Sequence, residues 1–425
     1  MQPPRGTRDF MPEEMVKRNY MFRTISEVFE SFGFKPLETP AFESWELLAK
    51  KGGGGDEVKN EIYYFKDKSD RELGLRFDLT VPMTRVVASN PQLPKPFKRY
   101  QIGRVWRYDR PQAGRFREFW QADVDVVGSA SMKADSECLL VAVRALEALG
   151  FQKFVVRVNN RKILNGLIEL VKIKDRVGVF RSLDKLEKIG KKGVMEELSS
   201  KNVSKKDAEK LFSLIELKGK PDDMIKKGRS LLKGIKIAEE GMDELETMIT
   251  EAKMYEISDY IIFDFSLVRG LDYYTGPIFE VFEKGFENLG SISAGGRYDK
   301  MIGMYGRDTP ATGISLGIER IYEIMKERKM FKTSGVTKAF VLCMNDSVRK
   351  DAIKLSQELR KNNINNEIDL IGRDFRKQLD YANSTNIPFV VFVGEKEVKT
   401  KKFTLKDMKS GKQELFSLQD LIKKL

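Results

Sequence analysis

The sequence of 425 residues contains no histidine, the side chain that most often transfers protons near neutral pH. Its absence excludes a Ser-His-Asp triad and every metal site that requires imidazole ligands, such as the HExxH pattern. Chemistry in this chain must therefore use arginine, carboxylates, tyrosine and metal-bound phosphate. The composition favours a reaction that stabilises charge over one that shuttles protons.

Other absences exclude further classes of protein. The two cysteines, Cys138 and Cys343, lie far apart and form no CxxC pattern, which excludes a disulfide framework and a cysteine zinc site. No apolar run approaches the roughly 20 residues that cross a bilayer. The polar residues 1–10 lack the core of a signal peptide. We therefore expect a cytoplasmic protein with no membrane partner.

The charge balance is a second compositional signal. Lysine and arginine number 76 against 63 aspartates and glutamates, which gives a net charge of +13 and a pI near 9.3. Such basicity fits a polyanionic partner such as nucleic acid, and fits a soluble lysine-rich surface equally well. The length and a hydrophobic content of 41% predict two or three packed domains.

The first part of the chain alternates helix and strand patterns. Apolar spacing predicts helices at residues 12–32 and 134–149, and a strand at residues 154–158. Two prolines favour an edge strand or an interface at residues 34–42. Between residues 62 and 128, short runs broken by proline and glycine predict antiparallel strands with hairpins.

The residue pattern of the second part of the chain changes twice. From about residue 172 to 253, leucine and isoleucine recur at helical spacing among lysine and glutamate, which predicts a helical insert. Residues 259–325 return to strands, with a glycine-rich turn at residues 294–297 and a helix beginning near Gly317. After a linker at residues 330–336, an α/β pattern follows: strand 339–344, helix 348–361, strand 366–371, helix 375–383 and strand 388–393.

Two segments concentrate polar side chains in apolar surroundings. Residues 267–280 place Arg269, Asp272, Tyr273 and Tyr274 close to two glycines, which favours contact with a ligand over a purely structural strand. The second segment, between Phe97 and Gly128, interleaves arginines with aromatic residues: Arg99, Tyr100, Arg104, Trp106, Arg107, Arg110, Arg115, Phe116, Arg117, Phe119 and Trp120. Nucleotide binding requires that combination, because guanidinium groups hold phosphate and aromatic faces stack on the base. The alternative is a nonspecific basic hairpin.

Four motifs, taken together, carry a family resemblance. They are residues 33–40, similar to motif 1 of the class II aminoacyl-tRNA synthetases; Arg107-Tyr-Asp109 with Arg115-Phe-Arg-Glu-Phe119, which resembles motif 2; residues 313–320, which resemble motif 3; and residues 267–274, which resemble the signature of histidyl-tRNA synthetases. The resemblance covers nearly the whole chain. It implies an α+β fold with a class II antiparallel sheet flanked by helices.

The resemblance also implies three domains. A catalytic domain would span residues 1–171 and 254–329, interrupted by a helical insertion domain at residues 172–253. Residues 336–425 would form a C-terminal α/β domain that binds the anticodon. The family works as a homodimer through motif 1, which implies that Pro40 lies at the dimer interface.

The implied activity is ligation of histidine to tRNA-His in two steps. L-Histidine reacts with ATP to give histidyl-adenylate, and the histidyl group then passes to the 3′ end of the tRNA. Arg107 and Arg269 match the two catalytic cations, which would hold the α-phosphate from opposite sides and stabilise charge as the carboxylate attacks. Both would also contact the substrate histidine.

The ATP site implied by the resemblance adds four residues to Arg107. Phe119 would stack on adenine and Arg320 would hold the γ-phosphate, while Asp109 and Arg115 complete the site. Mg²⁺ would bridge the phosphates, with no metal ligand assigned to the protein.

The implied histidine site has two ends. Asp78, Leu79, Thr80 and Gln121 match the positions that receive the α-amino group, and Asp125, Tyr273 and Tyr274 match the pocket for the imidazole. Imidazole offers one N–H donor and one acceptor, so a carboxylate and a phenol together can read both. A ligand without those nitrogens would leave Asp125 buried and unpaired.

The motif 2 turn implies a contact with the tRNA. Arg110 and Gln112 would face the acceptor end, while most lysines of the insert and the tail are better read as solvated helix faces. The chain departs from the family pattern at Asp109, where glutamate is usual, and at Ser315, where glycine is common. Asp125 and the Asp78-Leu-Thr segment resemble the archaeal and eukaryotic branch.

Three other functions compete with this one on the sequence. Paralogues of histidyl-tRNA synthetase serve as regulatory subunits of ATP phosphoribosyltransferase, but they lack the anticodon domain and tend to lose catalytic residues, whereas this chain keeps Arg107, Arg269 and Arg320. A synthetase-like domain of a stress kinase would need a kinase segment, which this sequence does not contain. Specificity for another class II amino acid conflicts with the Tyr273-Tyr274 signature.

The missing histidine has two explanations. An enzyme without its own product residue can be translated when charged histidyl-tRNA is scarce. The rival is a composition bias of the lineage, and counting histidines in other proteins of the organism separates the two.

Overall fold

The structure, a computed structural model, describes residues 1–425 except 51–60, 109–115, 172–174, 184, 269–272 and 332–334. The chain divides into two compact units. The first comprises Met1–Asp9 and Met21–Met330, and the second comprises Phe10–Tyr20 and Phe331–Leu425. Helix α1 (Pro12–Ser31) therefore contributes to both units.

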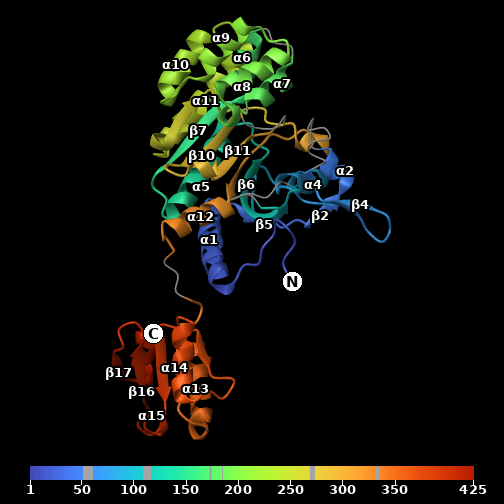
Figure 1. The fold of residues 1–425 in the computed structure, drawn as a ribbon. Coiled ribbons are helices and arrows are strands. Elements are labelled where there is room, and N and C mark those ends of the chain that lie inside the picture. The colour runs from blue at the N-terminus through green and yellow to red at the C-terminus, as the bar shows by residue number, and fades with distance from the viewer. Residues whose placement is uncertain (51–60, 109–115, 172–174, 184, 269–272, 332–334) are drawn as a thin grey trace. The chain divides into compact units, whose positions relative to one another are not determined.

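A large sheet forms the centre of the first unit (Figure 1). Its strands, in spatial order, are β1 (Lys35–Pro36), β5 (Phe97–Trp106), β6 (Glu118–Val127), β12 (Ala311–Gly317), β11 (Ser293–Arg297), β10 (Pro277–Glu283), β7 (Phe154–Asn160), β9 (Ile261–Asp264) and β8 (Lys218–Gly219). The strands from β5 to β7 pair antiparallel throughout, while β1 with β5 and β7 with β9 pair parallel. The predicted antiparallel sheet is confirmed, with parallel pairs added near its edges.

The register of the three strands β5, β6 and β12 positions the site. Asp123 pairs with Gln101 on one side and Ser315 on the other. Because side chains alternate between the faces of a strand, Gln121, Asp123 and Asp125 share one face. We call this the site face.

The expected turn at residues 294–297 is wrong, because these residues belong to the central strand β11. A Cβ on Gly295 would lie 2.1 Å from the carbonyl oxygen of Gly313, and one on Gly296 would lie 2.6 Å from that of Pro277. The glycines are required by the close approach of neighbouring strands and not by a bend.

The expectation of strands alone between residues 62 and 128 is also incomplete. Helix α4 (Thr80–Ser89) interrupts them, and its Val81, Met83 and Val87 are buried in the core. The chain before α4 forms a small sheet with the order β2-β4-β3, comprising β2 (Phe42–Ser44), β4 (Glu72–Leu75) and β3 (Tyr64–Lys66). Helix α2 (Trp45–Ala49) follows β2. Tertiary burial here outweighs the β propensity of the valines.

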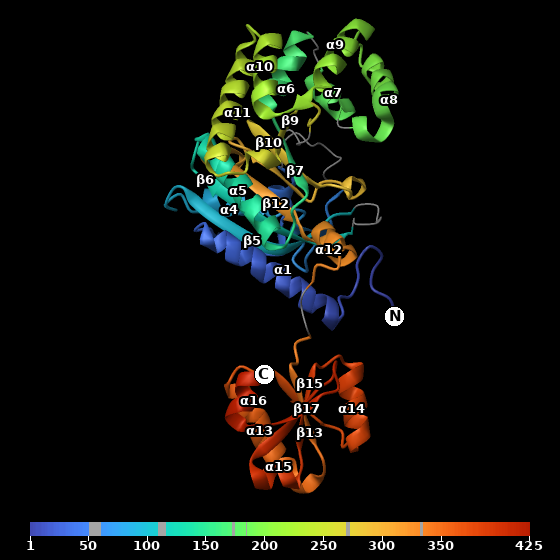
Figure 2. The ribbon, with the colours of Figure 1, turned by 90° about the vertical axis from the view of Figure 1, so that its left-hand side faces the viewer.

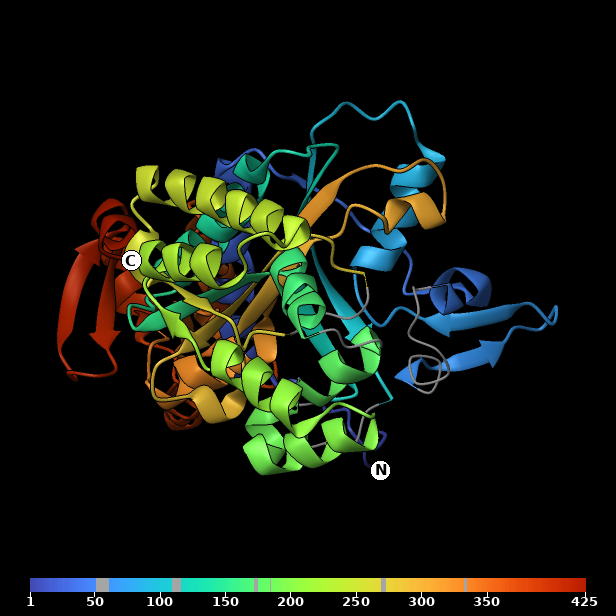
Figure 3. The same cartoon turned by 90° about the horizontal axis from the view of Figure 1, so that it is seen from above.

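Helices cover the sheet and extend beyond it. Helix α5 (Met132–Ala148), capped by Ser131, contacts β12 and β6, and also packs against α11. The helices that follow β7 gather at one end of the sheet (Figure 2, Figure 3). They are α6 (Arg161–Leu170), α7 (Arg176–Leu183), α8 (Leu186–Ser200), α9 (Lys205–Ile215), α10 (Pro221–Leu231) and α11 (Lys236–Met254). The predicted helical character of this region is confirmed, although β8 joins the central sheet.

The rest of the first unit closes around β10 to β12. Helix α12 (Ile318–Glu327) begins directly after β12, as the sequence predicts near Gly317. Short 3₁₀ helices connect these elements: η1 (Ser258–Tyr260), η2 (Glu287–Leu289) and η3 (Ile302–Met304).

The second unit contains a five-stranded sheet with the order β14-β13-β15-β16-β17. Its elements are β13 (Ala339–Cys343), η4 (Asp346–Val348), α13 (Arg349–Lys361), β14 (Asn366–Ile368), α14 (Phe375–Ser384), β15 (Phe389–Val393), α15 (Glu395–Thr400), β16 (Lys402–Asp407), β17 (Gln413–Ser417) and α16 (Leu418–Lys424). The predicted α/β pattern is confirmed through β15, and the last hairpin and two helices were not predicted. None of the helices in the described ranges combines the length and apolar composition that crossing a bilayer requires.

Candidate active site

Arg107 and Phe119 form the first part of the site. Arg107 directly follows β5, and its backbone N–H donates to the carbonyl oxygen of Arg117 at 2.9 Å. Its Nε donates to the carbonyl oxygen of Phe77 at 3.0 Å, and its guanidinium lies over the Phe119 ring, 5.2 Å from the centroid. A positioned cation and an aromatic face therefore lie side by side, as phosphate and base binding require.

Gln121, Ser315 and Asp123 form a short relay across β6 and β12. Gln121 Nε2 donates to Ser315 Oγ at 2.9 Å, and the Ser315 hydroxyl hydrogen-bonds the Asp123 carboxylate. Among the described residues, Gln121 Oε1 and Asp123 Oδ1 are shielded from solvent and have no hydrogen-bond partner. Burial raises the pKa of Asp123 to about 7. The relay leaves two acceptor oxygens on the site face.

Arg99, Asp125 and Tyr298 form a buried cluster beside the relay. Arg99 is fully buried and pairs with Asp125 at 2.5 Å, while the Tyr298 hydroxyl donates to Asp125 Oδ1. Burial raises the pKa of Asp125, and the charge of Arg99 opposes that rise. A Cβ on Gly313 would lie 2.2 Å from Asp125 Oδ1, so glycine makes room for the carboxylate.

Asp78 and Leu79 reach the same cluster from the segment before α4, whose first residue is Thr80. Asp78 is buried, and its Oδ1 accepts a hydrogen bond from the N–H of Val81 at 2.9 Å. The carbonyl oxygen of Leu79 accepts from Arg99 Nη2 at 3.2 Å. The negative charge of Asp78 acts on the pKa of both Asp123 and Asp125.

Tyr273 and Tyr274 close the cluster from the segment that precedes β10. Their ring centroids are 4.5 Å apart, and Tyr273 lies 6.4 Å from the Tyr298 ring. A Cβ on Gly296 would lie 3.0 Å from the Tyr274 ring, so the strand admits this phenol closely. Burial raises the pKa of Tyr274 well above its ordinary value, so the phenol stays protonated.

Arg320 lies at the start of α12, which follows β12. Its Nη1 donates to the carbonyl oxygen of Ser291 at 2.5 Å. The neighbouring Glu319 is buried, accepts from the backbone N–H of Trp120 at 3.2 Å and pairs with Arg8 at 3.6 Å. These contacts tie the start of α12 to β6, the strand that carries Phe119.

Several predicted residues lie outside the described part of the chain: Arg269, Asp109, Arg110, Gln112 and Arg115. Pro40 is described and exposed. Within the described ranges, no group of three carboxylate or cysteine side chains is placed to hold a metal ion.

Sequence reasoning missed three residues of the site: Arg99, Asp123 and Tyr298. Arg99 is one of the arginines of its segment and has no predicted role in binding, and neither Asp123 nor Tyr298 is predicted to belong to the site. Strict alternation along β6 could have pointed to Asp123, because it lies two residues from both Gln121 and Asp125. No local pattern links Arg99 or Tyr298 to Asp125.

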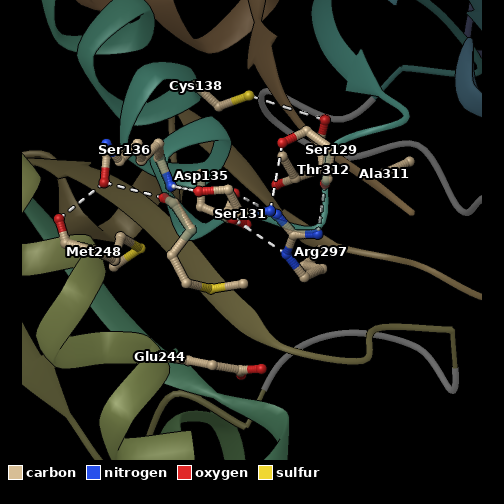
Figure 4. A network of polar contacts seen from close by, with 12 residues as sticks. Ser129, Ser131, Asp135, Ser136, Cys138, Glu244, Met248, Arg297, Ala311 and Thr312 are labelled. Atoms are coloured by element: carbon tan, nitrogen blue, oxygen red, sulfur yellow. Dashed lines mark hydrogen bonds and ion pairs between the residues drawn. The ribbon is translucent and has the colours of Figure 1, made fainter. Parts of the chain in front are cut away.

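A second buried network surrounds Arg297, the last residue of β11 (Figure 4). Arg297 is 1% exposed and donates through Nε and Nη2 to Asp135 Oδ2. It also donates to the carbonyl oxygens of Ser129 and Ser131 and to Asp299 Oδ1, each at 3.0 Å. Burial raises the pKa of Asp135 to about 6 against the opposing charge of Arg297.

The same network anchors the end of the tyrosine segment. The N–H of Thr275 donates to the carbonyl oxygen of Arg297 at 2.8 Å, and the N–H of Arg161 donates to that of Gly276. Tyr273 and Tyr274 immediately precede these anchored residues. Arg297 thus connects the start of α5 to the backbone that carries the two phenols.

The fold and the site together define the class as a class II aminoacyl-tRNA synthetase. The central sheet is antiparallel and carries an arginine–aromatic pair beside buried carboxylates and phenols. A separate α/β unit follows it in the chain. A family model for histidyl-tRNA synthetase matches residues 6–321, and one for an anticodon-binding domain matches residues 338–425. The chain belongs to the histidyl-tRNA synthetase family.

Individual relatives agree with the family models. The chain is similar to the histidine–tRNA ligase of Pyrococcus furiosus, at 37% identity over 98% of this chain and 97% of the relative. It is also similar to the crystal structure of histidyl-tRNA synthetase from Nostoc sp. PCC 7120, with a TM-score of 0.89 and 32% identity over 100% of this chain and 98% of the other. A Bacillus halodurans structure, described as an ATP phosphoribosyltransferase regulatory subunit/histidyl-tRNA synthetase, matches with a TM-score of 0.78 and 25% identity, over 92% of this chain and 98% of the other.

The activity follows from family and relatives together. The enzyme is a histidine–tRNA ligase, which uses ATP to activate L-histidine as histidyl-adenylate and then transfers the histidyl group to tRNA-His.

Proposed function

We propose that the site face binds L-histidine with its amino group toward Gln121 and its imidazole toward Asp125. Asp78, Leu79 and Thr80 complete the amino end, and Tyr273 and Tyr274 complete the imidazole pocket. The observation that carries this assignment is the buried cluster in which Arg99 pairs with Asp125 and donates to Leu79. Arg99 of β5 thereby links the segment before α4 to Asp125 on β6, which supports one pocket with two ends.

ATP binds beside the histidine in this proposal. Arg107 holds the α-phosphate and the histidine carboxylate, Phe119 stacks on adenine, and Arg320 holds the γ-phosphate. The position of Arg107 over the Phe119 ring supports these roles. Arg269 acts as the second catalytic cation.

Further groups complete the nucleotide site. Asp109 and Arg115 contact ATP. Mg²⁺ would be held by the phosphates of the nucleotide and would neutralise part of their charge, because this ion keeps several waters and prefers phosphate and carboxylate oxygens. The chemistry assigned to the protein is positioning and charge stabilisation, and no step depends on a metal ligand of its own.

The wider organisation is also proposed. Residues 1–171 and 254–329 form the catalytic domain, residues 172–253 the insertion domain and residues 336–425 the anticodon-binding domain. Arg110 and Gln112 contact the tRNA acceptor end. The enzyme acts in the cytoplasm as a homodimer with Pro40 at the interface, which the exposure of Pro40 and of Phe42 (50%) supports.

The test is ATP–pyrophosphate exchange with the intact protein. We expect exchange that depends on L-histidine and is absent when histidine is omitted or replaced by another amino acid. The alternative is a regulatory subunit, one of the two descriptions given to the Bacillus halodurans protein. It predicts that histidine binds while exchange stays at the background rate.

Asp125→Asn is expected to weaken histidine more than ATP. The amide can no longer accept from the imidazole N–H with a full charge, and hydrogen bonds to charged groups contribute about 1.5–3 kcal/mol. We expect the KM for histidine to rise by about 10- to 100-fold, with a much smaller change for ATP. An equal rise for both substrates would refute the imidazole role of Asp125.

A further inference from the structure

Asp123 is a buried carboxylate of the site face to which the proposed function gives no role. Its residue is 4% exposed and lies between Gln121 and Asp125, two positions that the proposed function gives to opposite ends of histidine. Its Oδ1 has no hydrogen-bond partner among the described residues. A buried, unpaired acceptor in a polar site calls for a ligand, because leaving it unmatched costs free energy.

The relay through Ser315 decides which atoms remain for that ligand. Because Gln121 Nε2 donates to Ser315 Oγ, the amide presents its carbonyl oxygen Oε1 to the site. The serine proton is in turn directed at Asp123, which leaves Oδ1 open. Two acceptors therefore remain, while the Ser315 hydroxyl and one of the two N–H donors of Gln121 are occupied. Such a pair suits a group that carries several N–H donors.

The charges around Asp123 also favour a ligand group with several N–H donors. Asp123 faces Arg99 of β5, Asp125 of its own strand and Asp78 of the segment before α4, and it accepts from Ser315 of β12. Burial, with smaller contributions from the like charges of Asp125 and Asp78, raises the pKa of Asp123 to about 7, although the charge of Arg99, which pairs with Asp125, opposes the rise. A ligand that brings a positive charge relieves this repulsion.

We propose that Asp123 is a second carboxylate receptor for the α-ammonium group of histidine, and that Ser315 is the residue that positions it together with Gln121. The inference rests on the proposed function, in which this face binds histidine, and adds a residue pair to its amino end. Ser315, where the family commonly has glycine, thereby acquires a role. No covalent bond between protein and ligand forms or breaks; the ammonium group displaces a proton from the Asp123 carboxyl to solvent.

Three ligands separate the two ends of the pocket in a calorimetric titration of the full-length protein. L-Histidine and L-histidinol both carry the amino group, whereas imidazolepropionate keeps the ring and the carboxylate but lacks the amine. In Asp123→Asn, we expect the Kd of the two amines to rise by about 10- to 100-fold, as for a lost hydrogen bond to a charged group. The Kd of imidazolepropionate should stay unchanged.

Ser315→Ala tests the positioning role with less risk to folding. Removing a neutral hydrogen bond is expected to weaken both amines by about 2- to 10-fold and again to spare imidazolepropionate. Ser136→Ala is the matched control, since Ser136 is a fully buried serine whose hydroxyl donates to the Met248 carbonyl oxygen away from the site face (Figure 4). It should leave all three affinities unchanged.

Proton release provides an independent readout. Titrations near pH 7 in buffers of different ionisation enthalpy should show that wild-type protein releases protons when either amine binds, and fewer in Asp123→Asn. A raised carboxyl pKa must fall when a cation binds, which fixes the sign. Imidazolepropionate should release none from this group.

The outcomes separate the two proposals. If Asp123→Asn or Ser315→Ala weakens all three ligands equally, Asp123 acts structurally and the inference is overturned. Selective loss of imidazolepropionate would place Asp123 at the ring instead and would also overturn it. If wild-type protein fails both to bind histidine and to support exchange, the proposed function itself fails, irrespective of Asp123.

Discussion

Replacing Arg107 by alanine is expected to lower histidine-dependent ATP–pyrophosphate exchange by about 10²- to 10³-fold, the usual effect of removing one group that stabilises charge in a transition state. Arg107 is held ready for this task, since its Nε already donates to the carbonyl oxygen of Phe77 and its guanidinium lies over Phe119. The chain contains no histidine to share the work. Both kcat and the affinity for ATP should fall, because the cation contacts the α-phosphate before and during the reaction.

Arg104→Ala is the matched control for this prediction. Arg104 lies on β5, three residues before Arg107, but its side chain is 44% exposed and pairs with Glu118 at 2.9 Å. Its guanidinium lies over the Trp120 ring, whereas that of Arg107 lies over the Phe119 ring. Exchange should be nearly unchanged in Arg104→Ala, and a similar loss in both variants would show that the effect is not catalytic.

Arg269→Ala is expected to collapse exchange in the same assay, with the free energy of unfolding little changed. This expectation follows from the motif resemblance and the role proposed for the second cation. If Arg269→Ala kept near wild-type exchange while Arg107→Ala lost it, the paired-cation mechanism would be wrong.

The second large effect concerns stability. Arg297→Met is expected to lower the free energy of unfolding by about 3–5 kcal/mol, since it leaves a buried charge without its partner. Asp135 would lose the cation that contacts it through two nitrogens, and the carbonyl oxygens of Ser129 and Ser131 would lose their donors. Denaturant unfolding followed by circular dichroism measures the loss.

The pH dependence gives a further check on this network. Burial holds the pKa of Asp135 at about 6, above its ordinary value of 3.8, so the folded protein binds this proton more tightly than the unfolded chain. The contribution of Asp135 to stability therefore falls as the pH rises between these values. Without Arg297 the ionised form of Asp135 is still less favoured. The decrease in the free energy of unfolding caused by Arg297→Met should therefore be smaller at pH 5 than at pH 8.

Two variants complete the stability experiment. Arg297→Met combined with Asp135→Leu should recover part of the loss, because it removes the stranded charge. Arg144→Met removes an exposed arginine, 41% accessible and paired with Glu147, and should cost no more than about 1 kcal/mol. A small effect of Arg297→Met, equal to that of Arg144→Met, would contradict the structural role of the network.

Local patterns predicted much of the fold. The helix expected at residues 134–149 is α5, and the helix expected near Gly317 is α12, since apolar spacing at 3.6 residues directly reflects a buried helix face. The errors occurred where tertiary contacts outweighed local preference. Residues 294–297 resembled a turn because glycine favours turns, yet Gly295 is there to admit the backbone of Gly313.

The residues of the candidate site divide in the same way. Arg107 and Phe119 could be named from one short motif, and Gln121 and Asp125 from their match to the histidine-binding positions of the family. Ser315 could be noted as a departure from the family pattern but not interpreted. Its hydrogen bond to Gln121 spans 194 positions in sequence and exists only because β12 pairs with β6 in one register.

By itself, the sequence determined the family and the reaction class and predicted the chemical groups that would carry the reaction, because these depend on residue types in short ordered motifs. The tertiary structure alone decided that Arg99 and Tyr298 both contact Asp125, and that Asp123 is left with an unpaired oxygen beside Gln121. The physical reason is strand pairing: register brings side chains from distant segments to one face, and burial then makes each unmatched charge or hydrogen bond count.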